Sequence, residues 1–92
     1  MLVARFSLGR LLATPGALEV LSASGVSPFD LLRRHQVGDW GDLGVADKLA
    51  NEVALEQGTR LLSAYTLPGG KRLWVITEWD RSLTTILRPE EY

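Results

Sequence analysis

The sequence predicts an α+β fold: an N-terminal strand, three short helices and then a three-stranded antiparallel meander, with the helices packed on one face of the sheet. Residues 60–88 form three runs rich in aliphatic, β-branched and aromatic residues, separated by two short reversals. Upstream, two helix starts place proline at the first helical position. Helices and strands are therefore segregated along the chain, which is typical of this class.

Length and composition suit a single domain over residues 1–92. Hydrophobic residues make up 46% and charged residues 23% of the chain, and no linker-like tract divides it. Its apolar runs are far shorter than the roughly 20 residues that span a bilayer, and no secretory signal is visible at the N-terminus. The chain has no cysteine, which excludes disulfides and suits a reducing compartment. We therefore expect a cytoplasmic protein that does not bind membranes.

The charge balance bears on the kind of partner. The formal net charge is −1, whereas proteins that bind nucleic acid usually carry a basic surplus that neutralises phosphates. A protein partner is therefore favoured over a nucleic acid.

The first half of the chain predicts one strand and two helices. Residues 3–13 alternate loosely, with Phe6 and Leu8 expected to face inward and a break allowed at Gly9. The first helix is expected to start at Thr14 and Pro15 and to end at Gly25, and the second starts in the same way at Ser27 and Pro28.

A third helix is expected from Val45 to Gln57, ended by Gly58. Val45, Leu49 and Val53 form an apolar stripe at helical spacing, which predicts the face that packs inward. The polar residues on the other side are expected to face water: Asp47, Lys48, Asn51, Glu52 and Glu56.

Two loops carry candidate contact residues. Residues 38–42 combine two glycines, two acids and Trp40, which is either a lid over the core or a contact surface. The reversal at residues 78–82 places Trp79 at a loop tip beside Asp80 and Arg81. An exposed tryptophan beside charges is typical of an interface hot spot, and the alternative is that the ring folds back over the sheet. The predicted partner-binding residues are Trp40, Trp79, Asp80 and Arg81.

The N-terminal strand is expected to pair with the meander as a fourth strand, and the last strand, over residues 83–88, could still lie at an uncovered edge of the sheet. Unpaired backbone groups at such an edge can pair with another chain. This edge therefore predicts a route to a homodimer.

His35 is the only histidine. Its ordinary pKa near 6.5 would suit general acid–base catalysis, and the alternative is a structural histidine at a helix end, bonded to the backbone or to Asp39 or Asp42. No second imidazole or thiolate accompanies it, so no metal site is expected. The phosphate- and dinucleotide-binding glycine motifs are missing as well, so no cofactor is expected.

A catalytic alternative combines His35 with Glu78 and either Arg72 or Arg81. These are the residue types that a metal-independent ribonuclease uses as base, acid and phosphate-binding cation. The order of elements also resembles the small toxin and ribonuclease folds of the barnase and RelE kind, in which helices precede a twisted antiparallel sheet.

The segments RHQVGDWGDL, GTRLLSAYTL, RLWVITEWDR and TTILRPEEY resemble a family of small bacterial proteins, often encoded on plasmids and other mobile elements. Some members are labelled plasmid-related protein or type I restriction endonuclease subunit M. The resemblance covers nearly the whole chain and implies no assigned catalytic residue. The family pattern matches His35, Asp39, Trp40, Gly41, Tyr65, Trp74, Thr77, Glu78, Asp80, Arg81, Thr84, Thr85 and Tyr92.

Two functional hypotheses follow. The first is a small non-enzymatic accessory protein that binds another macromolecule, in the mobile-element or defence context that the resemblance implies. The alternative is a small metal-independent ribonuclease or toxin-like protein.

Overall fold

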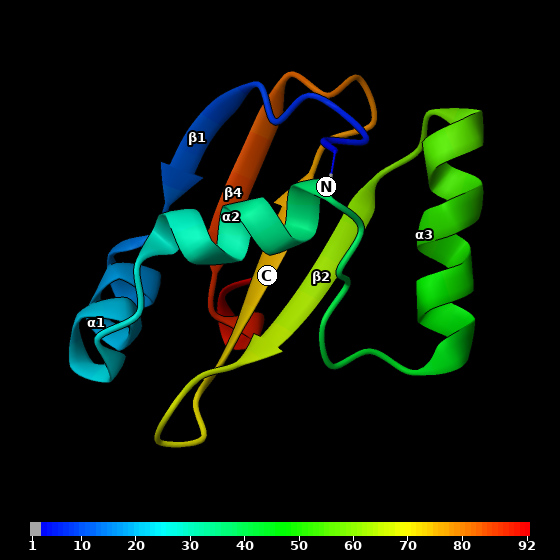
Figure 1. Cartoon of the computed structure of the whole chain (residues 1–92). Helices are drawn as coiled ribbons and strands as arrows, with labels where there is room; N and C mark the ends of the chain where they lie inside the picture. The colour runs from blue at the N-terminus through cyan, green and yellow to red at the C-terminus, as the bar shows by residue number, and fades with distance from the viewer. Residues whose placement is uncertain (1–2) are drawn as a thin grey trace.

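The helices and strands begin and end near the residues that carry start and stop signals. Thr14 and Ser27 cap two helices with their side-chain oxygens, and Gly25 and Gly58 end two helices in the left-handed conformation. The computed structural model describes residues 3–92 and confirms the α+β class (Figure 1). Its elements are β1 (Arg10–Ala13), α1 (Pro15–Ser24), α2 (Pro28–Gln36), α3 (Val45–Gln57), β2 (Leu61–Thr66), β3 (Arg72–Thr77), β4 (Leu83–Leu87) and the 3₁₀ turn η1 (Pro89–Glu91).

The four strands form one mixed sheet in the order β1-β4-β3-β2. The antiparallel meander of β2, β3 and β4 is confirmed, and β1 runs parallel to β4. Arg10 donates its N–H to the carbonyl of Ser82 at 2.9 Å, and Thr14 donates to Ile86 at 3.0 Å. The N-terminal strand thus joins the meander as the fourth strand, as expected. Residues 83–88 are therefore not an open edge, so the condition for a homodimer through this strand is not met. The two edges of the sheet are β1 and β2.

The N-terminal strand is shorter than expected. Of the segment 3–13 that was expected to be a strand, residues 3–9 are irregular and only residues 10–13 form β1. Gly9 has a φ of +65°, and a side chain there would meet the backbone of Ser82 at 2.3 Å, so glycine is needed where the chain passes close to the residue before β4. Phe6 and Leu8 nevertheless pack against the hydrophobic core, as predicted.

The main core lies between one face of the sheet and two of the helices. In Figure 1, α2 crosses in front of the strands, while α3 stands beside β2. Helices α1 and α2 pack on the same sheet face, where their side chains interdigitate with those of the three meander strands. This core consists of Ala17, Leu21, Leu31, Leu32, Tyr65, Leu67, Leu73, Val75 and Ile86. Within residues 3–92, no helix is long and apolar enough to cross a membrane.

Helix α3 has the predicted ends but the opposite orientation. Val45, Leu49 and Val53 are 76%, 60% and 49% exposed, whereas Asn51 is only 5% exposed. The expectation that the apolar stripe faces inward and Asn51 faces water is therefore wrong. The physical reason is the open edge of β2: the Asn51 amide donates to the carbonyl of Leu62 at 2.8 Å and accepts its N–H at 3.1 Å. A polar side chain is needed there because unpaired backbone groups are costly to bury.

Replacing Asn51 tests this contact. We expect Asn51→Ala to lower the free energy of unfolding by about 2 kcal/mol, because two backbone groups of Leu62 lose their partners. Urea unfolding monitored by circular dichroism measures this loss. Gln57→Ala, which removes an exposed amide from the same helix, is the control and should cost less than about 0.5 kcal/mol. Equal losses for the two variants would contradict the assignment.

Candidate interaction surface

His35 lies in the core. Its side chain is completely buried near the end of α2, and the rings of Phe6 and Trp40 pack edge-on against the imidazole. Nδ1 lies 2.6 Å from Oγ of Ser63, and Nε2 lies 2.9 Å from Oγ1 of Thr77. His35 is thus a structural residue, but its partners are strand hydroxyls and not the backbone or aspartates suggested by its position.

These hydroxyls belong to a hydrogen-bonded chain whose direction is fixed at one end. Thr84 donates to the carbonyl of Leu8 at 2.7 Å, so it must accept from Thr77, whose Oγ1 lies 2.7 Å away. Thr77 then has no proton left for His35 and accepts from Nε2–H. Nδ1 accepts from Ser63. The chain therefore selects the neutral Nε2–H tautomer and connects α2 with three strands and the N-terminal segment.

Burial and, secondarily, the positive charge of Arg81 lower the pKa of His35 from 6.5 to about 3. The imidazole is consequently neutral at physiological pH. A general acid or base must reach the proton that it transfers. Because both ring nitrogens of His35 are occupied and the ring is sealed from solvent, it cannot meet this requirement in this conformation.

Of the other candidates for catalysis, Arg81 lies near Glu78 but Arg72 does not. Arg72 begins β3 and Glu78 follows its last residue, so their α-carbons lie about 20 Å apart at the usual rise of a strand. The Arg72 guanidinium donates to the carbonyl of Asp42 at 2.9 Å. Arg81 also bonds to backbone carbonyls, as described below. Because the His35 side chain is completely buried, it does not share a surface cleft with Glu78 and an arginine.

Trp40 is a lid over the core and not a contact surface. The side chain is 4% exposed and packs with Leu61 and Ala54 beside α3. Its Nε1–H donates to Glu52 at 2.8 Å, and the same carboxylate accepts two hydrogen bonds from Arg5. These hydrogen bonds lower the pKa of Glu52, and those from Arg5 have the largest effect. Trp40 is therefore not accessible to a partner in this conformation.

The loop around Trp40 closes the outer edge of β2. Ala64 donates its N–H to the carbonyl of Trp40 at 3.2 Å, and its own carbonyl accepts the N–H of Asp42 at 2.6 Å. The Asp42 carboxylate then accepts the N–H of Thr66 at 2.8 Å, which lowers the pKa of that carboxyl group. Together with Asn51, the loop occupies the backbone groups through which β2 could pair with another strand.

The turn at residues 78–82 is held rigidly by Arg81. This residue has a φ of +61°, the one positive value at a non-glycine position within residues 3–92. Its guanidinium donates to the carbonyls of Thr59, Glu78 and Trp79 at 2.7 to 3.2 Å, and to that of Ala54 in α3 at 3.0 Å. These bonds offset the strain of the left-handed backbone and attach the turn to the last residues of α3.

Trp79 projects from this rigid turn. Its side chain is 66% exposed, so the structure places it in the exposed alternative and not folded over the sheet. Asp80 tightens the turn by accepting the N–H and hydroxyl of Ser82, which lowers the pKa of its carboxyl group. Of the four predicted contact residues, Trp79 and Asp80 are exposed, Arg81 is partly buried and Trp40 is buried. Asp80 and Arg81 also shape the turn that presents Trp79.

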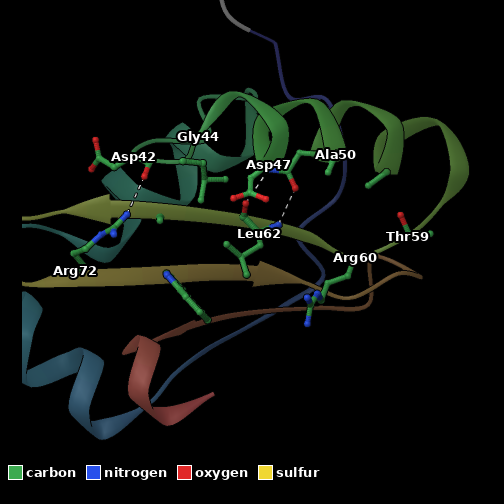
Figure 2. Close-up of a pocket in the computed structure, with 13 residues that line it drawn as sticks. Asp42, Gly44, Asp47, Ala50, Thr59, Arg60, Leu62 and Arg72 are labelled. Atoms are coloured by element: carbon green, nitrogen blue, oxygen red, sulfur yellow. Dashed lines mark hydrogen bonds between the residues drawn. The ribbon is translucent and has the colours of Figure 1, made fainter.

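A separate cleft of about 640 Å³ lies between α3 and the strands β2 and β3 (Figure 2). Asp42 and Arg72 lie at one end and Arg60 at the other, and Ala50 of α3 faces Leu62 of β2 across the middle. Asp47 of α3 also lines the cleft, between its two ends, so polar and apolar side chains alternate along it.

Comparison with family models, curated proteins and solved structures finds no match. The resemblance to plasmid-encoded bacterial proteins remains a prediction. Within residues 3–92, no three histidine, cysteine, aspartate or glutamate residues gather into a set that could hold a metal ion.

The sequence contained one unused signal for the role of His35. Strand alternation puts Ser63 of β2 on the same sheet face as Tyr65, and Thr77 of β3 on the same face as Val75. Polar hydroxyls on a core face need a buried partner, and His35 is the only imidazole available. The reversed orientation of α3 had no comparable signal.

Proposed function

We propose that this chain is a non-enzymatic binding module that contacts a protein partner through Trp79. The observation that carries the proposal is the 66% exposure of a tryptophan on a turn fixed by the hydrogen bonds of Arg81 and Asp80. Tryptophan is enriched among the residues that dominate binding energies. A rigid turn also loses little conformational freedom on binding, which favours affinity.

Charge and composition support the same proposal. A net charge of −1 does not favour attraction to phosphates. The absence of cysteine suits the reducing cytoplasm, and the family resemblance suggests a mobile-element or defence context for the partner. Burial of His35 removes support for the ribonuclease alternative.

Site-specific photocrosslinking tests this proposal. A photoreactive phenylalanine analogue at position 79 should capture a discrete protein in cells that express the chain, whereas the same analogue at Phe29, which is 62% exposed on α2, should not. With the captured protein purified, we expect Trp79→Ala to weaken binding at least tenfold and Phe29→Ala less than about twofold. Trp79→Ala should leave the unfolding free energy within about 0.5 kcal/mol of the parent.

Three outcomes would contradict the proposal. The first is that the analogue at position 79 captures no protein, and the second is that nuclease digestion removes the crosslinked product. The third is that Phe29→Ala weakens binding as much as Trp79→Ala does.

A further inference from the structure

The outer face of α3 carries aliphatic side chains that no part of residues 3–92 covers. Val45, Leu49 and Val53 are spaced four residues apart and are 76%, 60% and 49% exposed. The opposite face supplies Asn51 and Ala54 to the interior. A helix normally turns its apolar stripe inward, and contiguous exposed apolar residues mark interaction sites.

We propose that this stripe is the interface of a homodimer, in which α3 packs antiparallel against α3 of a second copy. The stripe is symmetric about Leu49, with one valine four residues before it and one four residues after it. A two-fold axis at Leu49 therefore places Val45 opposite Val53 of the partner subunit, and Leu49 opposite its own copy. This self-matching spacing is what an isologous interface requires.

The shape of the helix suits this packing. Ala46 and Ala50 lie beside the stripe and are exposed. Small side chains at a contact let two helix axes approach toward the short end of the usual 8–10 Å range. The three larger side chains can then interdigitate with those of the second helix.

Charge also favours the antiparallel pairing. Glu56 lies on the same outward face and forms no ion pair within residues 3–92. The other end of α3 begins at Gly44, which provides no side-chain cap. Glu56 lies about 10 Å beyond Leu49 along the axis and Gly44 about 7.5 Å before it. Since side chains lean toward the helix N-terminus, each Glu56 would meet the uncapped, partly positive N-terminus of the partner helix.

The size of the stripe sets the strength of the dimer. Stable interfaces bury about 800 Å² on each partner, and a 13-residue helix is only about 20 Å long and about 10 Å wide. The helix pair alone covers less than that area. The dimer is therefore weak and reversible, and dilute solutions contain monomer.

Cysteine trapping tests the proposal, because the natural chain has no cysteine. Under mild oxidation, Leu49→Cys should form a disulfide dimer at least about tenfold faster than Leu18→Cys, which is a control at a 51% exposed leucine of α1. A mixture of Val45→Cys and Val53→Cys chains should form the mixed dimer faster than either chain links to itself. Preferential linking of Val45→Cys to itself would overturn the antiparallel arrangement.

Sedimentation equilibrium of the unmodified chain gives the second measurement. From about 1 μM to about 1 mM, the average mass should rise toward that of a dimer. Leu49→Asp should abolish this rise, whereas Leu18→Asp and Trp79→Ala should leave it unchanged. A monomer at every concentration, or equal effects of Leu49→Asp and Leu18→Asp, would overturn the proposal and assign the stripe to a different protein. The unchanged Trp79→Ala result separates this interface from the Trp79 surface.

Discussion

The free energy of unfolding is expected to fall by about 1.4 kcal/mol for each pH unit between pH 6.5 and pH 4.5. The cause is His35, whose pKa is about 3 in the folded chain and 6.5 when it is exposed. Between these values the unfolded chain binds a proton that the folded chain does not. The contribution of neutral His35 is therefore complete above pH 6.5 and is lost as the pH falls toward 3, by about 5 kcal/mol in total.

Urea unfolding at a series of pH values measures this slope. The part of this interval above about pH 5.5 isolates His35. The carboxyl groups with lowered pKa add to the slope only nearer the ordinary values of 3.8 and 4.5, at which they titrate in the unfolded chain: Asp39, Asp42, Glu52, Asp80 and Glu90. His35→Gln is the matched variant, since its amide can donate to Thr77 and accept from Ser63 without titrating. It should show a flat profile above about pH 5.5. Parallel profiles for the two proteins would show that His35 is not the group responsible.

Gly41→Ala should lower the free energy of unfolding by at least about 4 kcal/mol, one of the largest effects expected of a single substitution. Gly41 has a φ of +76°, and an added Cβ would lie 2.0 Å from the carbonyl oxygen of Ala64 and 2.6 Å from the ring of Tyr65. The Trp40 loop would have to leave the edge of β2. The loss combines the strain of the left-handed backbone with the loss of the edge hydrogen bonds.

Gly58 provides the control for backbone strain. Its φ is +71°, but nothing lies within 4 Å of an added Cβ. Gly58→Ala should therefore cost only the left-handed conformation, about 1–2 kcal/mol. Denaturant unfolding of both variants compares the two costs. If Gly41→Ala cost no more than Gly58→Ala, the close approach of the loop to β2 would be disproved.

The sequence predicts those parts of the fold that depend on local signals. The ends of α3 follow from the apolar pattern that begins at Val45 and from the glycine at position 58. The meander follows from strand propensity and from the Pro-Gly-Gly turn at residues 68–70. The place of Trp79 in a turn follows from its position between two predicted strands, whereas its exposure was one of two alternatives.

The remaining features depend on contacts between distant segments. The hydroxyl partners of His35 lie 28 and 42 residues away, and the pairing of β1 with β4 has no local signature. Hydrophobic periodicity also misplaced the stripe of α3, because it assumes that burial of apolar area decides orientation. At the edge of β2, the hydrogen-bonding requirement of Leu62 selects Asn51 instead.

The position of β4 between β1 and β3 has a consequence for synthesis. The partner strand of residues 10–13 is made about 70 residues after them, which takes seconds at about 5–20 residues per second. The last link of the hydroxyl chain, from Thr84 to Leu8, spans 76 residues. The nascent chain can form its helices and its first hairpin in order, but β1 and the segment before it have to wait. Folding is therefore completed from the C-terminal side, and residues 8–13 reach their places only after β4 has been made.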